Sequence, residues 1–365
     1  MAQIKVESLD KLFGGFRAVK AASFTVEDGE FLCLLGPSGC GKTTTLRMIA
    51  GLELPTAGAI RLGGEDVTMN RASERDIAFV FQLFALYPHM NVRRNIGFPL
   101  KCEGVGAAEI DRRVEEAARI LRISHLLARP VSGLAGGDRQ RVALGRAIVR
   151  KPKCFLMDEP LGALDTEMRE AMIHELRALH DRLGATTVYV THDQLEAMAM
   201  ADKIAVMNNG AVEQIASPRD IYDRPASLFV ADFIGSPPMN FLPFRDRLAT
   251  GAQAIRLGER DIAIPAAREA LAESDLVLGV RPEHVRFTDG GMVRGEVYGV
   301  EYLGTTQIVT VTTCYGALKA RSPSSVSFKT GENVGLDFRP DTLSIFVKAS
   351  GRAIRTALHD GGTHG

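Results

Sequence analysis

A glycine-rich segment directly after a short apolar run limits what this chain can fold into. Phe31–Leu35 reads as a buried strand, and Gly36–Thr44 (Gly-Pro-Ser-Gly-Cys-Gly-Lys-Thr-Thr) follows it and opens a helix. Glycine, four residues and then Gly-Lys-Thr is the pattern of a phosphate-binding loop, called the P-loop below. Its glycines let backbone N–H groups surround a phosphate where a Cβ would collide, and the helix adds the positive end of its dipole. The segment predicts a strand–loop–helix unit of an α/β fold.

Two P-loop side chains add chemistry to the backbone. Lys42 supplies a mobile positive charge for the β- and γ-phosphates of a nucleotide, and the Thr43 hydroxyl is placed to bind Mg²⁺. The alternative is a glycine-rich turn without nucleotide, but strand, lysine, threonine and helix all occur together here. The residues of this segment predicted to bind nucleotide are Gly36, Pro37, Ser38, Gly39, Cys40, Gly41, Lys42, Thr43 and Thr44.

An apolar run that ends in two carboxylates is the second motif. Cys154–Met157 reads as a buried strand and is followed by Asp158 and Glu159. Because parallel strands end at the same sheet edge, we expect Asp158 beside the P-loop, where it can hold Mg²⁺ through water. Glu159 is placed to polarise the attacking water as a general base. Alone, such a pair is as often a solvated strand end; its place after the P-loop favours the catalytic interpretation.

Three further residues can be interpreted only together with the motifs described above. Gln82 follows the expected strand Ile77–Phe81 and could reach the metal or the water, and His192 follows Thr187–Val190 and could donate to the γ-phosphate. Phe13 could stack under adenine, a contact worth ~1–3 kcal/mol. Taken alone, each is more often a surface amide, a satisfied histidine or a core phenylalanine.

Strand-like and helix-like segments alternate over the first two-thirds of the chain. Ile204–Met207 reads as one more buried strand, and Glu167–Leu183 is expected to form a helix with one apolar face. This alternation implies a mainly parallel sheet with helices on its faces. Ile4–Leu9 and Ser23–Val26 are expected to form a small antiparallel layer. Of the eight histidines, His192 alone lies in a catalytic motif; on the expected helix, His174 and His180 are interpreted as solvated.

The helical period disappears after the stretch Gly235-Ser-Pro-Pro-Met-Asn. We therefore predict one domain over residues 1–235 and a second over 236–365. The short strand-like runs that follow are separated by turn residues and predict a small all-β barrel or sandwich. These runs are Leu276–Val280, Gly295–Tyr302, Gln307–Thr312, Ala317–Arg321, Val334–Phe338 and Leu343–Val347. The polar tail after Gly351 is expected to fray.

Bulk properties argue against several classes of protein. Lysine plus arginine equal aspartate plus glutamate at 44 each, so no global basic field points to nucleic acid. No apolar run approaches the ~20 residues that cross a bilayer, and the N-terminal residues lack a secretory signal pattern. Five cysteines are scattered without a CxxC pair, which favours free thiols in a reducing cytosol. Any work at a membrane is expected from its cytoplasmic side, through partners.

The segment Leu134–Arg141 (Leu-Ala-Gly-Gly-Asp-Arg-Gln-Arg) precedes a helix and lies upstream of Asp158. It resembles the signature motif of ABC-transporter ATPases, which usually reads Leu-Ser-Gly-Gly-Gln. The other diagnostic segments of that family also occur in order within residues 1–235: the P-loop, Gln82, Asp158-Glu159, Leu164-Asp165 and His192.

This resemblance implies a P-loop NTPase fold of the ABC type, with a mainly parallel sheet, an antiparallel β layer and a helical subdomain. In this family two chains sandwich two ATP molecules, each γ-phosphate touching the P-loop of one chain and the signature of the other. By resemblance, Phe13 stacks on adenine, Gln82 is the sensor linked to the permease, and His192 is the switch histidine. The residues that would contact the partner's ATP are Ala135, Gly136, Gly137 and Asp138.

The C-terminal part indicates which type of ABC ATPase the chain resembles. Phe233–Pro243 and Gly279–Val285 look like the hinge and the OB-like regulatory domain of maltose- and glycerol-phosphate-type importers, although polyamine, iron and molybdate importers carry similar appendages. Ala85–Met90 resembles the surface that receives a permease coupling helix. The resemblance implies a homodimer on the cytoplasmic face of the inner membrane, two transmembrane permease subunits and, indirectly, an extracytoplasmic solute-binding protein. The solute is chosen by those partners.

The signature departs from the family pattern at two positions. Ala135 stands where serine is usual, and Asp138 where glutamine is usual. Losing the serine's hydrogen bond to a charged group costs ~1.5–3 kcal/mol. If that loss falls wholly in the transition state, hydrolysis slows on the order of 10- to 100-fold. The sequence therefore predicts a weakened ATPase.

Two other functions are weighed against transport. ABC ATPases of DNA repair or translation usually show a coiled-coil insertion or two ATPase domains in one chain, and this chain has neither. Alternatively, the C-terminal domain could bind oligonucleotides or an inorganic anion, as OB folds can. Tyr298, Tyr302 and Phe346 are the candidate aromatics for a nucleic-acid platform, but packing on a strand face is the expected role of each. Transport is favoured, with no nucleic-acid partner.

Overall fold

The computed structural model describes residues 2–360 and divides into two compact units. Unit one is Met1–Pro218 and unit two is Arg219–Gly365. The two short helices α7 (Pro218–Asp223) and α8 (Leu228–Phe233) therefore belong largely to unit two, whereas the sequence-based boundary lies between residues 235 and 236.

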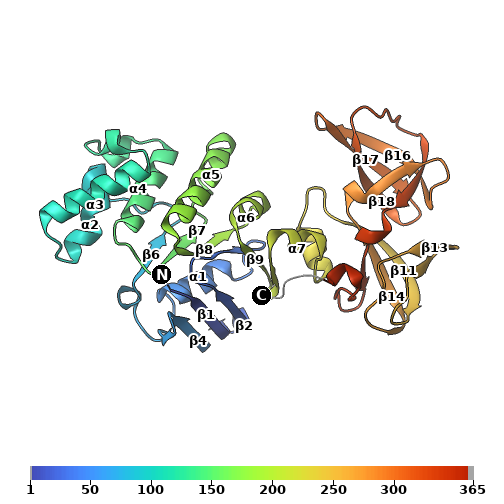
Figure 1. Cartoon of the computed structure of the whole chain (residues 1–365), viewed down its shortest axis with the longest axis horizontal. Helices are drawn as coiled ribbons and strands as arrows, with labels where there is room; N and C mark the ends of the chain where they lie inside the picture. Colours follow the sequence, from blue (N-terminus) through green and yellow to red (C-terminus); the bar gives the residue numbers. More distant parts are fainter. Residues whose placement is uncertain (1, 361–365) are drawn as a thin grey trace. The chain divides into compact units, whose positions relative to one another are not determined.

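A six-stranded, mainly parallel sheet forms the centre of unit one, in the order β10-β9-β3-β8-β7-β6 (Figure 1). Only the β9–β10 pair is antiparallel. The strands are β3 (Phe31–Leu35), β6 (Ile77–Val80), β7 (Cys154–Asp158), β8 (Thr186–Thr191), β9 (Lys203–Asn208) and β10 (Ala211–Ala216). The five strands expected in this sheet are confirmed to within one residue at each end. Every residue of β3, β7 and β8 is buried, which explains the apolar runs Phe31–Leu35, Cys154–Met157 and Val188–Val190 within them.

A second, antiparallel sheet in the order β2-β1-β4-β5 confirms the expected antiparallel layer. Its strands are β1 (Ile4–Phe13), β2 (Phe16–Val26), β4 (Ala57–Leu62) and β5 (Glu65–Asp66). The first two strands are longer than expected, because they pair almost to their connecting turn, from Ile4 opposite Val26 to Phe13 opposite Phe16. This pairing holds Phe13 at the tip of a hairpin.

The helices of unit one form two groups (Figure 1). One group follows strands of the central sheet: α1 (Lys42–Ala50), α5 (Thr166–Leu183) and α6 (Gln194–Met200). The other group is the helical subdomain, α2 (Val92–Cys102), α3 (Ala107–Ile120) and α4 (Gly136–Ile148), in which α2 contacts both α3 and α4. The α5 helix begins one residue before the expected Glu167 and is capped by Asp165, whose carboxylate accepts from Met168 N at 2.9 Å.

Beyond α7 and α8, the described part of unit two contains three antiparallel sheets around a shared apolar core. The sheet β11-β14-β20 comprises Asn240–Leu248, Leu271–Val280 and Ser344–Val347. The sheet β15-β19-β16-β17-β18 comprises Val285–Thr288, Asn333–Phe338, Val293–Tyr302, Thr306–Thr313 and Gly316–Pro323, and the hairpin β12-β13 comprises Ala254–Leu257 and Arg260–Ala263. The all-β prediction is confirmed, and each expected strand is present; β11, β12, β13 and β15 were not anticipated.

Three expectations about exposure are wrong. His180 is buried, since its ring packs edge-on against Phe31 and its Nδ1 lies 3.1 Å from the Thr187 hydroxyl. Burial, with the nearby charge of Arg177 adding to it, lowers the pKa of His180. By contrast, His174 is exposed as expected.

In unit two, Tyr298 and Tyr302 are about three-quarters exposed, whereas Phe346 is fully buried as expected of a packing residue. The tail does not fray over residues 352–360, because Ile354 is fully buried and its N–H donates to Ile345 O at 2.7 Å. The remainder of the tail, residues 361–365, lies outside the described residues.

Within residues 2–360, no helix has the length and apolar character needed to span a bilayer. All five cysteines are free thiols, as expected.

Candidate nucleotide site

The P-loop joins β3 to α1 in a conformation that only glycine tolerates at two points. A Cβ on Gly36 would lie 2.3 Å from the carbonyl oxygen of Met207, and Gly41, the N-cap of α1, has a φ of 102°. Lys42 is buried, and its ammonium donates to the carbonyl oxygens of Gly36 and Pro37 at 2.8 and 2.9 Å. The lysine charge is thereby held inside the curve of the loop, at the amino end of α1, where a phosphate is favoured.

Thr43 connects the P-loop to the carboxyl end of β7. Its hydroxyl donates to Asp158 Oδ1 at 2.9 Å. Asp158 is 6% exposed, and burial raises the pKa of its carboxyl, against the hydrogen bond from Thr43 and the positive charge of Arg47. The two residues therefore present hydroxyl and carboxylate oxygens side by side, the ligand type that Mg²⁺ prefers.

Glu159 lies between Gln82 and His192, two residues that the sequence analysis proposed for the same site. Its Oε2 is 3.3 Å from Gln82 Nε2 and 3.3 Å from His192 Nδ1. The position is set by the backbone, because Glu159 N donates to Val190 O of β8 and its φ of 43° turns the chain sharply out of β7. The ends of β6, β7 and β8 thus bring an amide, a carboxylate and an imidazole together on one sheet edge.

The signature segment lies at the start of α4, which is well separated from α1 in Figure 1. Ala135 is the N-cap of α4 and provides no side-chain cap. A Cβ on Gly137 would lie 2.4 Å from the Met168 sulfur of α5, so this glycine allows the two helices to pack closely. Within one chain, the signature is therefore not brought to the P-loop.

Asp138 forms an ion pair with a residue of its own helix. Arg141, one turn further along α4, lies 3.3 Å from Asp138 and 2.9 Å from Glu175 of α5. Asp138, which stands where the family usually has glutamine, is thus one carboxylate of a three-residue ion-pair network between α4 and α5.

Phe13 is nearly half exposed at its hairpin tip, so the core-phenylalanine alternative is wrong. The Lys11 ammonium lies 4.7 Å from the centre of its ring. An exposed aromatic face held by a hairpin is suited to base stacking.

Sequence reasoning missed a buried network behind His192. Glu196 Oε2 accepts from the hydroxyls of Tyr189 and Thr191, at 2.8 and 2.7 Å. Burial is the main reason that the pKa of Glu196 is raised. Arg169 adjoins this network, donating to Leu164 O at 3.1 Å and lying 3.4 Å from an Asp193 carboxylate oxygen. An acidic residue four positions after His192, at the start of a helix, was the available signal.

A second missed residue, Arg146 of α4, holds the loop that follows Gln82. Its guanidinium donates to Ala85 O at 2.7 Å and to Phe84 O at 3.0 Å, and it lies over the Tyr87 ring. Phe84 and Ala85 both have positive φ, so this loop departs from ordinary backbone geometry. The signature helix and the loop after Gln82 are therefore joined directly.

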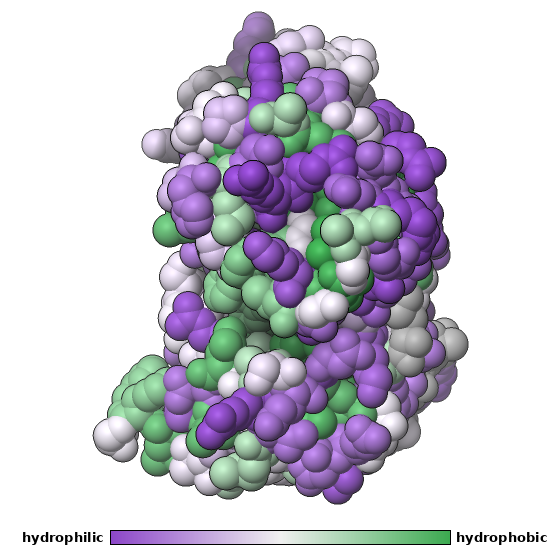
Figure 2. Space-filling view, turned by 90° about the vertical axis from the view of Figure 1, so that its left-hand side faces the viewer, coloured by the Kyte–Doolittle hydropathy of each residue, from purple (hydrophilic) through white to green (hydrophobic). Residues whose placement is uncertain are grey.

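A cavity of about 530 Å³ lies beside this loop, between α2 and α3. His89, Met90 and Phe98 contribute apolar and aromatic lining, and Arg94 and Lys101 contribute positive charge. Figure 2 views the chain from the side where Figure 1 places α2 and α3, and shows apolar patches among hydrophilic residues.

Three family models match the chain in succession. The ABC transporter model matches residues 19–162, the MalK OB fold domain model residues 235–285, and the TOBE domain model residues 278–346. The first contains the P-loop, Gln82, the signature and Asp158–Glu159, whereas Phe13, His192 and the network around Glu196 lie outside it.

Curated relatives match nearly the whole chain. The trehalose/maltose import ATP-binding protein MalK of Thermococcus litoralis is 47% identical, over 97% of this chain and 100% of the relative. The sn-glycerol-3-phosphate import ATP-binding protein UgpC of Ruegeria pomeroyi is 45% identical, over 97% and 99%. The sulfoquinovosyl glycerol transport ATP-binding protein SmoE of Agrobacterium fabrum is 43% identical, over 97% and 100%.

Solved structures resemble the N-terminal part. A bacterial ABC transporter cassette solved as a dimer has a TM-score of 0.54 and 31% identity, covering 59% of this chain and 99% of the other. The cbiO1 part of an ABC transporter complex from Clostridium perfringens has a TM-score of 0.56 and 28% identity, covering 60% and 89%.

Proposed function

Because the chain belongs to the ABC transporter family of ATP-binding proteins, we propose that it is the ATP-hydrolysing subunit of an importer for a sugar or a glycerol-phosphate-like solute. The observation that carries this proposal is the meeting of Gln82, Glu159 and His192 at the sheet edge that also holds the P-loop. The names of the relatives support the class of solute.

Nucleotide binding is assigned to the P-loop and to the β1–β2 hairpin. Phe13 stacks on adenine, the backbone N–H groups of Gly36–Thr44 surround the phosphates, and Lys42 turns its ammonium from the loop carbonyls to the β- and γ-phosphates. The Thr43 hydroxyl and the Asp158 carboxylate would hold Mg²⁺, and Gln82, which follows β6 at the same end of the sheet, is a further candidate ligand. The bound ion would neutralise charge on the phosphates.

Hydrolysis is assigned to Glu159. Its carboxylate accepts a proton as the water oxygen bonds to the γ-phosphorus and the bond from that phosphorus to the β–γ bridging oxygen breaks, leaving ADP and phosphate. The Gln82 amide orients the same water, and the His192 imidazole donates to the γ-phosphate. The 3.3 Å contacts of Glu159 with both residues support this division of roles.

The second half of each site comes from another copy of the chain. The signature residues Ala135–Asp138 lie on α4, apart from the P-loop of their own chain, so a symmetric dimer can place them against the partner's γ-phosphate. The dimeric cassette among the similar structures supports this arrangement. Backbone N–H groups at the amino end of α4 remain as donors even though Ala135 has no hydroxyl.

The permease is proposed to dock at the cavity between α2 and α3. Leu83, in the loop that follows Gln82, is 80% exposed, and the cavity presents Phe98 with Arg94 and Lys101, so an amphipathic helix with an acidic residue fits this surface. Two permease subunits would bind the dimer, placing it peripherally on the cytoplasmic face of the inner membrane. A solute-binding protein on the other side would act only through them.

Replacing Glu159 with Gln tests the proposal. The variant should lose ATP hydrolysis by on the order of 10²-fold or more yet form a stable dimer with ATP and Mg²⁺, detected by size-exclusion chromatography with light scattering. Glu167→Gln, a carboxylate exposed at the start of α5, is the matched control. A Glu159→Gln variant that remains monomeric with bound ATP would contradict the sandwich.

A further inference from the structure

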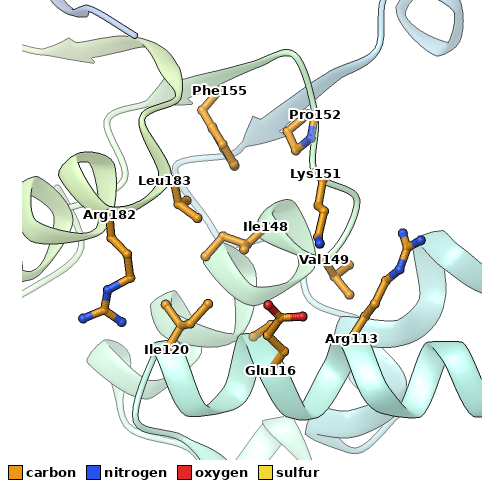
Figure 3. A pocket seen from close by; sticks show the side chains of 11 residues that line it. Arg113, Glu116, Ile120, Ile148, Val149, Lys151, Pro152, Phe155, Arg182 and Leu183 are labelled. Atoms are coloured by element: carbon orange, nitrogen blue, oxygen red, sulfur yellow. The ribbon is translucent and has the colours of Figure 1, made fainter. Parts of the chain in front are cut away.

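A second cavity in unit one is not used by the proposed reaction. Its volume is about 270 Å³, and it lies where α3 and the end of α4 meet the start of β7 and the end of α5. Most of its wall is apolar, formed by side chains such as Ile120, Ile148, Phe155 and Leu183 (Figure 3). The volume is just below the ~300–1,000 Å³ of pockets for drug-sized ligands, so a small organic molecule fits and a nucleotide does not.

The charges around this cavity are mostly positive. Arg113, Lys151 and Arg182 line it, and Glu116 is the one acidic lining residue. Figure 3 shows the Lys151 side chain extending toward the middle of the pocket, with Glu116 and Arg113 on the α3 side. No carboxylate among the described residues lies within ion-pair distance of Lys151 or Arg182, whereas Arg113 pairs with Glu109 at 2.6 Å and Glu116 with Arg112 at 3.6 Å.

Lys151, an exposed lining residue, has an unusual backbone conformation. Lys151 has a φ of 54°, which is uncommon for a residue with a side chain. It follows α4, and its N–H donates to Ile148 O at 2.9 Å. A cation held in an unusual backbone conformation beside an apolar wall is suited to a ligand that has both an apolar body and a negative group.

Three elements connect the cavity with the proposed catalytic edge. The α4 helix ends at Ile148 in the cavity wall and begins at the signature, and α5 ends at Leu183 in the wall and begins after Asp165. The β7 strand contributes Phe155 and ends at Asp158. A ligand that packs against all three therefore contacts the far ends of the elements that carry the reacting groups.

We propose that this cavity binds a small organic anion with an apolar body, of the short-chain carboxylate class, and that its occupancy changes ATP turnover. The carboxylate pairs with the Lys151 ammonium, Arg182 on the opposite side of the cavity adds positive charge, and the alkyl chain packs on Ile148 and Phe155 (Figure 3). The proposed binding of the anion goes beyond the proposed function and does not depend on it. The effect of the anion on ATP turnover rests on the proposed ATPase function.

Calorimetric titration of the full chain with sodium octanoate, at low ionic strength and below its micellar concentration, tests binding. We expect one saturable site per chain, and roughly 3- to 10-fold weaker binding to the double variant Lys151→Gln/Arg182→Gln, as the loss of two partly exposed charges predicts. Glu116→Gln should bind octanoate a few-fold more tightly, because it removes the one acidic lining group. Lys153→Gln, an exposed lysine outside the lining, is the matched control.

Octylammonium is the matched probe of opposite charge. It should bind more weakly than octanoate, and the double variant should reduce that difference. Absence of a saturable octanoate site, equal binding of the two probes, or octanoate binding unaffected by the double variant would each overturn the site. ATP turnover at saturating octanoate should differ from turnover without it in the wild type but not in the double variant; a wild-type rate that octanoate leaves unchanged would overturn the effector role alone.

Discussion

The Thr43 hydroxyl donates a hydrogen bond to Asp158 Oδ1 at 2.9 Å, across 115 residues of sequence. The contact joins the first turn of α1 to the last residue of β7, because the strands before the P-loop and before Glu159 end at the same edge of one parallel sheet. It brings together the two oxygen groups proposed to hold Mg²⁺.

Removing this hydroxyl should impair the use of Mg²⁺. Thr43→Val keeps the shape of the side chain but loses the donor and the ligand, and we expect turnover to fall roughly 10- to 100-fold, as for other lost metal contacts. Steady-state ATPase assays over a range of MgCl₂ concentrations measure the effect. Thr43→Ser, which keeps the hydroxyl, should retain most of the activity; equal losses in both variants would count against a role in metal binding.

Restoring serine in the signature should act on stability and on turnover separately. Ala135 is the N-cap of α4, so Ala135→Ser should add ~1 kcal/mol of stability by capping and should raise turnover by donating to the partner-bound γ-phosphate.

Ala135→Asp is the matched control for this change. It also caps the helix but places a negative charge against phosphate, so stability should rise while turnover falls. Thermal denaturation and ATPase assays distinguish the two effects. An unchanged or lower rate in Ala135→Ser would contradict the predicted cause of a weakened ATPase.

Arg146 should keep the loop after Gln82 in place. Lysine cannot reproduce the two guanidinium bonds to Phe84 and Ala85 carbonyls, so Arg146→Lys should increase hydrogen exchange over residues 83–90. Exchange followed by mass spectrometry measures this change. Arg139→Lys, on the same helix but bonded to Ser132 O, provides the comparison and should leave this segment protected. Equal exchange in the two variants would show that the loop is held by other contacts.

The buried carboxyl of Glu196 should make stability depend on pH. Burial raises its folded-state pKa above the ordinary 4.5, so its contribution to stability is fully present below that value and is lost as the pH rises through the raised pKa. The amide introduced by Glu196→Gln would be neutral at every pH, and its oxygen can still accept from both hydroxyls.

We therefore expect Glu196→Gln to gain stability relative to wild type as the pH rises from about 4.5 toward neutrality, where the wild-type carboxyl loses its proton while it is buried. Urea denaturation followed by circular dichroism measures the difference. Glu167→Gln controls for the loss of a surface carboxylate. If Glu196→Gln is less stable than wild type at the upper end of this range, the hydrogen bonds of the charged form outweigh its burial.

The sequence by itself determined the five parallel strands of the central sheet and what the P-loop can bind. Apolar runs such as Phe31–Leu35 lie in fully buried strands, and the glycines before Lys42 suit only a tight phosphate-binding turn, because both properties are local. That Thr43 and Asp158 lie close together was also predictable, because the parallel strands that precede them end at the same edge of the sheet.

Other features were decided only by the tertiary structure. The helical period of α5 does not say how far its apolar face extends, so the burial of His180 depends on Phe31 lying opposite it. The alternation along β16 is the same whichever face is covered, which is why packing was expected of Tyr298 and Tyr302 although both are exposed. The hydrogen bonds of Arg146 join two segments that are distant in the sequence. A long arginine side chain can reach many carbonyl groups, and tertiary packing decides which of them it bonds. No local sequence pattern predicts that packing.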